Sequence, residues 1–589
     1  MGWEAWLSLA VVAWCFAMLA FSWATPDLIM SAGLTLLLVT GVLTPGEALA
    51  GFSNQGMLTV AVLYVVVSGL TETGAVGWLV HSLLGRPRTL VHAQTRLMLP
   101  VAALSAFLNN TPVVAVFVPA LREWARRNRL PLSKLLIPLS FASIAGGTCT
   151  LIGTSTNLVV NGLLTEQAGE PRLALFDLLW TGLPVVVCVF LFVLLFGRWL
   201  LPERTRRAFQ PEALREYTVE MLVPPTSPLV GRSIEQAGLR ALPGLFLAEI
   251  ERHGDILPAV SPRTALRAYD RLVFVGAIES VMDLQKTRGL LPATKQVFKL
   301  EEPRQNRCFV EAVVSGSCPL VGKSVKEGRF RTRYDAVIIA LAREGERIRG
   351  KIGDIVLQPG DTLLLEARPV FVERQRNSRD FFLISKMGGL HPPNHAKALP
   401  ALGIVAGMVL AVAAGWLSML EAALVAAGLM IAAGCTNGAV ARRSPDWQVL
   451  VVIAASFGIG AALDKSGAAA TIAGGLIGLA GGQPWPTLVL VFVVTALFTA
   501  LATNNVAAVL VFPIATAAAA AMQVSILPFA VTIMVAASAS FATPFGYQTN
   551  LMVYSAGGYR FGDFVRIGVP LTLLVGLVTV ALVPLVWVF

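Results

Sequence analysis

The sequence predicts an α-helical polytopic membrane protein with inverted repeats and re-entrant hairpins, which carries an inserted α+β domain pair. Hydrophobic residues make up 55% of the 589 residues and charged residues only 14%, against about 25% in ordinary globular chains, and the mean hydropathy is +0.70. The apolar runs form two stretches, at about 5–201 and 398–589, separated by a polar segment. The two apolar stretches repeat one another, which is the third observation.

The first stretch, 1–201, is the predicted N-terminal transmembrane repeat. Its opening run is apolar from Trp6, but Glu4 stands where a signal peptide carries basic residues, and no small-residue cleavage site follows. We interpret this run as a retained span. The six cysteines are scattered without a pair at metal-ligand spacing, so neither a disulfide framework nor a zinc site is indicated.

A re-entrant hairpin is predicted at about 97–121, where Asn109, Asn110 and Thr111 interrupt an apolar run that has arginines on both flanks. A single crossing needs about 20 apolar residues and would place one of the basic flanks outside. Two half-helices of about 12 residues, rising about 1.5 Å per residue, instead reach the middle of the bilayer and return. We therefore expect this hairpin to enter from the cytoplasm.

The second stretch, 398–589, is the predicted C-terminal transmembrane repeat. At an offset of about 393 residues, segment 463–468 repeats 70–75 and segment 546–551 repeats 153–158. Duplicated halves are typical of secondary transporters. The sequence therefore favours a transport function.

The copy of the hairpin lies at about 486–523, around Thr503, Asn504 and Asn505, and has no charged residue on either flank. Such flanks suit a hairpin that enters from outside. Five crossings per half, with both termini outside and the polar segment inside, place nearly every basic residue in the cytoplasm. Two parallel copies with one more crossing each are the alternative.

The polar segment is itself duplicated, with lobes predicted at 205–292 and 296–385. Segment 227–233 recurs as 318–324, at an offset of about 91 residues. These lobes resemble the C-terminal lobe (RCK_C) of TrkA-type regulators of potassium conductance, through the Pro-Leu-Val-Gly turn and a Gly-Asp pair before a late strand. Tyr269 stands where that pattern expects the glycine. In that family the lobes dimerise and sometimes bind small ligands, so the resemblance implies a ligand such as a nucleotide.

Four polar interruptions lie inside the apolar stretches, at 109–111, 148–157, 503–505 and 543–550. Non-helical backbone at membrane depth is tolerated only where it is buried in protein or lines a wet cavity, so we expect the four breaks to face one another. Neutral oxygens suit a hard cation such as Na+, and half-helix N-termini suit an anion. Asn and Thr can also simply join helices, at roughly 0.6–2 kcal/mol per bond, but joining needs no matched breaks.

The four breaks contain no Asp, Glu, Lys, Arg or His, whereas a proton-coupled pump usually has a titratable group at that depth. A neutral site binds a divalent anion best when cations bind beside it, because Coulomb attraction in a low dielectric offsets dehydration. This gives obligatory Na+/anion symport a physical reason.

At these residues the sequence is similar to the divalent anion/sodium symporter family, over nearly all of both apolar stretches. That family carries Ser-Asn-Thr motifs at two hairpin tips, which contact substrate oxygens and frame Na+ sites with two unwound loops. The resemblance implies substrate binding by Asn109, Asn110, Thr111, Thr503, Asn504, Asn505, Thr543 and Thr549. It implies Na+ binding by Asn110, Gly153, Thr154, Ser155, Asn157, Asn504, Gly546 and Asn550. Neither tip is a strict Ser-Asn-Thr, which leaves the substrate open.

We therefore expect a secondary active transporter, not an enzyme, in the bacterial inner membrane with its lobes in the cytoplasm. It would couple Na+ to a small divalent anion, with sulfate favoured over dicarboxylate because the combination with lobes looks like the sulfate-permease-like branch. The resemblance also implies a homodimer, and we expect no nucleic-acid partner despite the net charge of +11. The alternatives are a cation, metal-citrate or arsenite transporter or antiporter of the same superfamily, and a non-transporting nutrient sensor.

Overall fold

The computed structural model describes the chain to Phe589 in two compact units, the membrane unit (Met1–Glu203, Pro392–Val553 and Phe561–Phe589) and the central unit (Arg204–His391 and Tyr554–Arg560). The residues not described are 1, 21–22, 76–83, 86, 88, 129, 167, 170–172, 204–217, 240–244, 253–254, 259–260, 262, 277–289, 293–307, 316–317, 344–345, 349–351, 368–370, 372–374, 376–379, 388–396, 502 and 545.

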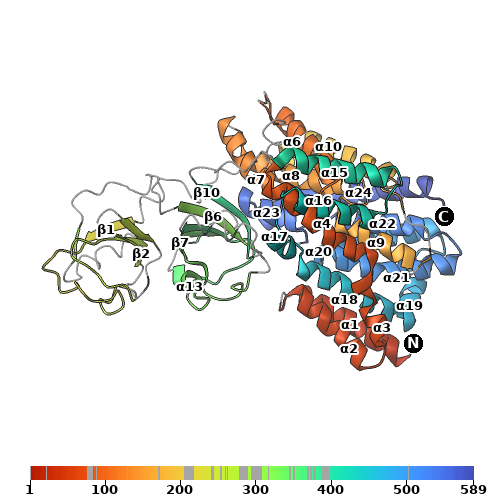
Figure 1. Cartoon of the computed structure of the whole chain (residues 1–589). Helices are drawn as coiled ribbons and strands as arrows, with labels where there is room; N and C mark the ends of the chain where they lie inside the picture. The colour runs from red at the N-terminus through yellow and green to blue at the C-terminus, as the bar shows by residue number, and fades with distance from the viewer. Residues whose placement is uncertain are drawn as a thin grey trace. The chain divides into compact units, whose positions relative to one another are not determined.

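The membrane unit is helical in both halves of the chain (Figure 1). The helices of the first half are α1 (Trp3–Ala20), α2 (Pro26–Val39), α3 (Pro45–Leu49), α4 (Gln55–Glu72), α6 (Leu90–Ser105), α7 (Asn110–Arg127), α8 (Leu136–Gly147), α9 (Ser155–Glu166) and α10 (Leu179–Leu200). Those of the second half are α15 (Ala398–Ala413), α16 (Met419–Ala432), α17 (Gly438–Arg443), α18 (Trp447–Lys465), α19 (Ala468–Leu479), α20 (Pro484–Leu501), α21 (Asn504–Met522), α22 (Leu527–Ser538), α23 (Gln548–Gly557) and α24 (Phe561–Val586).

Five helices of the described part are long and apolar enough to cross a membrane, or six if the pair α19 and α20, bent by 119°, counts as one span. Polar side chains start several of the helices at positions where the apolar runs begin. Asn54 Oδ1 accepts a hydrogen bond from the Met57 backbone N–H at 3.1 Å at the start of α4, and Asp446 Oδ1 accepts one from Val449 at 3.3 Å at the start of α18. The prediction of an α-helical polytopic membrane protein is confirmed.

The two halves of the membrane unit exchange partners. Helix α2 of the first half packs against α18 of the second, and α16, which matches α2 in sequence position, packs against α4, which matches α18. Helix α10 likewise packs against its counterpart α24. This reciprocal packing is the pattern expected of two repeats related by an approximate two-fold axis.

The hairpin arms are longer than the sequence suggested. Helices α6 and α7 have 16 and 18 residues, and α20 and α21 have 18 and 19, so the predicted arm length of about 12 residues is wrong. Helices α6 and α7 span Leu90–Ser105 and Asn110–Arg127, and the re-entrant hairpin at about 97–121 stays a prediction. One reason for the longer arms is that a polar residue within an arm finds a partner: Gln94 is buried in α6 and its Nε2 donates to Lys134 O at 2.9 Å.

The central unit contains two five-stranded antiparallel sheets with the same strand order. The first runs β3-β2-β4-β1-β5 and the second runs β8-β7-β9-β6-β10. The strands of the first sheet are β1 (Thr218–Leu222), β2 (Leu245–Arg252), β3 (Asp255–Pro258), β4 (Arg271–Gly276) and β5 (Leu291–Pro292). Those of the second are β6 (Cys308–Val314), β7 (Ala336–Arg343), β8 (Glu346–Arg347), β9 (Thr362–Ala367) and β10 (Phe381–Met387), with the short helix α13 (Phe330–Tyr334) before β7.

The same turn precedes β4 in the first sheet and β9 in the second. Gly360 there has a φ of +86°, and Tyr269 adopts the same left-handed region with a φ of +66°. A buried aspartate closes each turn with a bidentate arginine: Asp270 accepts from Arg252 at 2.8 Å through both oxygens, and Asp361 accepts from Arg343 at 2.7 and 2.9 Å. Substitution of the glycine has therefore left the shape of the turn unchanged, at the cost of a strained tyrosine.

Candidate functional site

Two unwound loops follow the helices α8 and α22 at matching places in the two halves. In the first loop Asn157 Nδ2 donates to Gly147 O at 3.2 Å and to Thr150 O at 2.8 Å. Each of these two bonds joins the start of α9 to a backbone carbonyl at or just beyond the end of α8. The Asn157 side chain therefore satisfies carbonyls that the end of α8 leaves free.

The second loop repeats this arrangement. Asn550 Nδ2 donates to Ser540 O at 2.6 Å and to Thr543 O at 3.0 Å, and all three residues lie at the same sequence spacing as in the first loop. Asn157 and Asn550 thus hold the loops in shape through their amide nitrogens. Only their Oδ1 atoms remain for an ion, and Asn550 Oδ1 already accepts from Ser140 Oγ at 2.7 Å.

The tip of the first hairpin bonds to the second half of the chain. Asn110 begins α7, and its Oδ1 accepts from Ser105 Oγ at 2.5 Å. Its Nδ2 donates to the Tyr547 hydroxyl at 2.6 Å, and Thr111 Oγ1 donates to Gln548 Oε1 at 3.0 Å. The first tip is therefore joined to the start of α23.

The tip of the second hairpin bonds to the first half. Asn504 Nδ2 donates to Thr156 Oγ1 at 2.8 Å, and Asn505 Oδ1 accepts from Ser155 Oγ at 3.1 Å and from Thr156 at 3.2 Å. The second tip is therefore joined to the start of α9. Each hairpin tip contacts the unwound loop of the other half, as two-fold symmetry requires.

Tyr547 lies where the halves meet, and sequence reasoning missed it. Besides accepting from Asn110, its hydroxyl lies 3.5 Å from Thr154 Oγ1, and these two residues are counterparts 393 positions apart. The signal was present: it is the one phenol within the break at 543–550, and a buried tyrosine hydroxyl nearly always has a polar partner.

Not every predicted substrate residue lies at these contacts. Thr549 is buried against α8, where its Oγ1 accepts from Ser140 Oγ at 2.8 Å, and it contacts neither tip. Asn109 and Ser155 line a cavity of about 30 Å³ that faces apolar residues of α4, including Tyr64. That volume holds roughly one water molecule, so this cavity beside the first tip is too small for an oxyanion.

Three oxygens converge on one point beside Gly546. A methyl group placed on this glycine would lie 2.5 Å from Ser540 Oγ, 2.8 Å from Thr499 O and 2.9 Å from Thr543 Oγ1. Ser540 Oγ is buried and has no hydrogen-bond partner among the described residues, and the same holds for the hydroxyl of Thr503 at the adjacent tip. We name Ser540, Thr499 and Thr543 the oxygen cradle. Thr543 Oγ1 accepts from the Gly546 backbone N–H at 3.3 Å and keeps a second lone pair. Uncharged oxygens with lone pairs to spare suit a small hard cation such as Na+.

The corresponding point in the first half is lined by backbone carbonyls. A methyl group on Gly153 would lie 2.6 Å from Gly147 O and 2.8 Å from Ser105 O. Asn157 Oδ1 is buried nearby without a partner in the described part of the chain. The residues of this loop therefore also fit a cation, with carbonyl oxygens in place of hydroxyls. Neither Ser540 nor Thr499 was predicted, because each lies in ordinary apolar sequence.

The electrostatic field of the tips comes from helix ends. The contact residues occupy the first two positions of α7, α9 and α21, while Gln548 begins α23 and Tyr547 precedes it. The N-termini of α7 and α23 therefore meet at the first tip, and those of α9 and α21 meet at the second. Each N-terminus carries roughly half a positive charge and unpaired backbone N–H groups. Among the described residues, no group of three His, Cys, Asp or Glu side chains that could hold a metal ion occurs. The arrangement favours a small anion at the tips with cations beside it.

Comparisons with known proteins give relatives over the whole length. A family model described as citrate transporter (CitMHS) matches residues 16–480 and 459–589. A putative sulfur deprivation response regulator of Chlamydomonas reinhardtii is 36% identical, covering 94% of this chain and 97% of that protein. Probable sodium/sulfate cotransporter 3 of the same organism is 29% identical, covering 97% and 87%. An uncharacterized transporter of Escherichia coli strain K12 is 31% identical, covering 94% of each chain.

Proposed function

Because this chain belongs to the citrate transporter family, we propose that it is a secondary active transporter that couples the entry of Na+ to the uptake of a small divalent anion, with sulfate favoured over dicarboxylate. The observation that carries this proposal is the meeting of four helix N-termini, in two pairs, at the two hairpin tips, within sequence breaks that contain no Asp, Glu, Lys, Arg or His. An anion is the ligand that such a field attracts.

The tip amides have hydrogen-bonding capacity left for the anion. Asn110 and Asn504 each donate one N–H group across the repeat boundary, to Tyr547 and Thr156. A carboxamide has two N–H groups, so one remains at each tip. Together with backbone N–H groups of the helix N-termini, these can bind the oxygens of a tetrahedral or planar oxyanion. Alanine at either position would remove the donor.

Sodium fits the oxygen cradle and the carbonyls near Gly153. Bound there, Na+ would supply the positive charge that a neutral protein site lacks, and thereby lower the cost of dehydrating a divalent anion. The absence of Asp, Glu, Lys, Arg and His from the four breaks supports Na+ over H+ as the coupling ion. The names of the sodium/sulfate cotransporter relatives agree with this choice.

Sulfate is favoured because several full-length relatives bear the name sodium/sulfate cotransporter, whereas the family model bears the name citrate. Transport would follow alternating access, in which one hairpin-bearing bundle moves against the remaining helices. Several expectations stay predictions. They are the location in the inner membrane with the lobes in the cytoplasm, regulation by the TrkA-C-like lobes at 205–292 and 296–385, a nucleotide ligand of these lobes, and a homodimer.

The test is uptake of labelled sulfate by proteoliposomes that contain the full-length protein, with and without an inward Na+ gradient. We expect uptake to need the Na+ gradient and to be abolished in Asn110→Ala and Asn504→Ala, while both variants elute as the folded protein. Uptake that ignores Na+ but follows a pH gradient would defeat the proposal. Full transport by either variant would reject that residue as part of the site.

A second function is favoured by one relative. The sulfur deprivation response regulator is 36% identical to this chain over nearly its whole length, so a sensor that uses the same scaffold is the main alternative. The two differ in flux. A sensor would bind sulfate, seen as stabilisation against heat in the presence of Na+, and would show no uptake above empty liposomes.

A further inference from the structure

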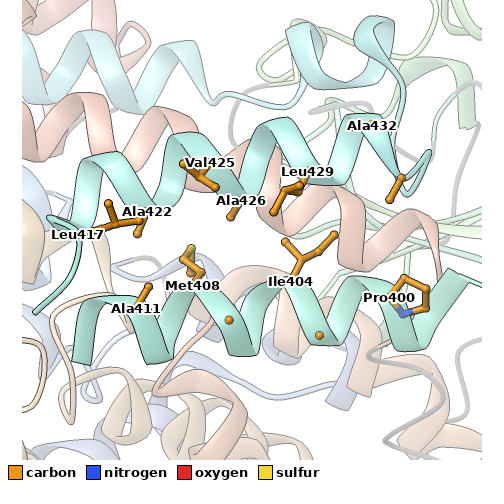
Figure 2. A pocket seen from close by; sticks show the side chains of 13 residues that line it. Pro400, Ile404, Met408, Ala411, Leu417, Ala422, Val425, Ala426, Leu429 and Ala432 are labelled. Carbon is orange, nitrogen blue, oxygen red and sulfur yellow. The ribbon is translucent and has the colours of Figure 1, made fainter. Parts of the chain in front are cut away.

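An open groove of the membrane unit lies between α15 and α16, outside the helices that form the tips (Figure 2). It has a volume of about 620 Å³, within the range of roughly 300–1,000 Å³ typical of ligand pockets. The thirteen residues that line it have hydrocarbon or thioether side chains or are glycine. Ile404, Met408 and Leu429 project into the space between the two helices. The groove therefore suits an apolar occupant.

Small residues leave the groove unfilled. Gly403 and Gly407 of α15 have nothing within 4 Å of the position that a Cβ would take, and Ala426 faces them from α16. The lining runs along α15 from Pro400 to Ala411, a length of roughly 16 Å at about 1.5 Å per residue. One leaflet of a bilayer contributes about half of the roughly 30 Å hydrocarbon core. The groove is thus as long as one leaflet is thick.

The two ends of the groove differ in charge. Lys397 precedes α15, is exposed, and donates from Nζ to Gly434 O at 3.0 Å beside the end of α16. An ammonium has three N–H donors, so two remain for another acceptor. At the other end, beyond Leu417, the exposed Glu421 caps α16, and Trp416 is 80% exposed, as interfacial tryptophans are. An anion is favoured at the Lys397 end and disfavoured at the other.

We propose that this groove binds one acyl chain of an anionic phospholipid, from the leaflet on the Lys397 side, with the phosphate of its headgroup at the Lys397 ammonium. The apolar lining takes the chain, the length matches one leaflet, and the lysine selects the headgroup charge. A second copy of the chain is a less suitable occupant. Subunits inserted in the same direction and related by a two-fold axis along this groove would bring Lys397 near its own copy, and like charges repel.

The test uses the full-length protein, purified in a mild detergent, stripped of lipid and titrated with dioleoylphosphatidylglycerol or dioleoylphosphatidylcholine, with bound lipid counted by native mass spectrometry. We expect one tightly held phosphatidylglycerol, bound at least fivefold more tightly than phosphatidylcholine, which is about the effect of one basic residue at a membrane surface. Lys397→Ala should remove this preference. Arg443→Ala, an exposed basic residue of α17 outside the groove, is its matched control and should keep the preference.

Gly407→Leu should fill the groove and eliminate the tight lipid, while Gly428→Leu, the same change on α16 where no groove lies, should leave it bound. Gly403→Leu repeats the test at a second open position in case one variant folds poorly. Equal lipid retention by Gly407→Leu and Gly428→Leu would overturn the proposal. It would also be overturned by the absence of headgroup preference in the wild type, or by a change of oligomeric mass on filling the groove, which would identify a subunit contact instead.

Discussion

Substitution of Gly546 by alanine tests the oxygen cradle directly. Its backbone is outside the left-handed region, so alanine is allowed there by φ. The added methyl group would stand 2.5, 2.8 and 2.9 Å from the oxygens of Ser540, Thr499 and Thr543, all closer than carbon and oxygen approach without a bond. It would therefore push apart the three oxygens that we assign to a cation.

The loss of Na+ affinity depends on which of the three oxygens can move away from the added methyl group. The hydroxyls of Ser540 and Thr543 can rotate away, whereas the Thr499 carbonyl belongs to the backbone of α20 and can be relieved only by a shift of the helix. Overpacking of this kind costs about 1–3 kcal/mol of the free energy of unfolding. Rotation removes two of the three cradle oxygens from the ion. Because an interaction with a charged group contributes about 1.5–3 kcal/mol, the affinity for Na+ should fall at least about tenfold.

Two measurements on the full-length protein give this quantity. The first is the Na+ concentration that half-activates sulfate uptake in proteoliposomes. The second is the rise of the melting temperature with NaCl relative to choline chloride in detergent, because a ligand that binds only the folded state stabilises it. Gly474→Ala is the matched control, since this glycine of α19 has nothing within 4 Å of its Cβ position. The control should keep the wild-type Na+ dependence.

An unchanged Na+ dependence of Gly546→Ala in both measurements would refute the assignment of the cradle. A lower melting temperature alone would not support it, because overpacking lowers stability in any case. The decisive quantity is the difference between NaCl and choline chloride. Only an effect on the cation changes that difference.

Four other substitutions separate the roles of particular side chains. Tyr547→Phe removes the acceptor of the Asn110 amide, and a buried donor that loses its partner costs about 1–3 kcal/mol of free energy. The KM for sulfate should therefore rise roughly tenfold in uptake assays, and an unchanged KM would contradict a role at the tip. Gly360→Ala should destabilise the second lobe by about 1–2 kcal/mol and Tyr269→Gly should not destabilise the first, as measured by hydrogen exchange of each sheet; equal protection in all forms would disprove backbone strain. Asp361→Asn leaves the partner guanidinium, about a third exposed, without its countercharge and should cost about 2–3 kcal/mol, below the roughly 3–5 of a fully buried pair; unchanged proteolysis of the second lobe would argue against it.

Much of the fold could be predicted from the sequence because the sequence contains two duplications, one of the apolar halves and one of the lobes. An offset of about 393 residues predicted that 546–551 would match 153–158, and the amides of Asn157 and Asn550 make equivalent bonds in the two loops. Polar residues in an apolar background marked the tips, and Asn110 and Asn504 lie at contacts between the halves. Pattern alone sufficed where polarity contrasted with its surroundings.

The remainder could not be predicted because it depends on partners brought together by folding. Ser140 lies within α8 and Ser540 follows α22, both in apolar sequence, and only the structure shows the first bonding to Asn550 and the second facing Gly546. Helix α6 begins at Leu90, before the apolar run from which the arm length was predicted, and a backbone carbonyl satisfies its buried Gln94. Periodicity and composition do not report such pairings.

The contact between Thr154 and Tyr547 constrains how the two halves can diverge. Positions that touch across a two-fold axis share one fixed volume, so a large residue in one copy obliges a small one in the other. The two halves therefore cannot both carry a tyrosine at positions 154 and 547. Two tyrosines would overfill that volume, so Tyr547 requires a residue about as small as Thr154 opposite it.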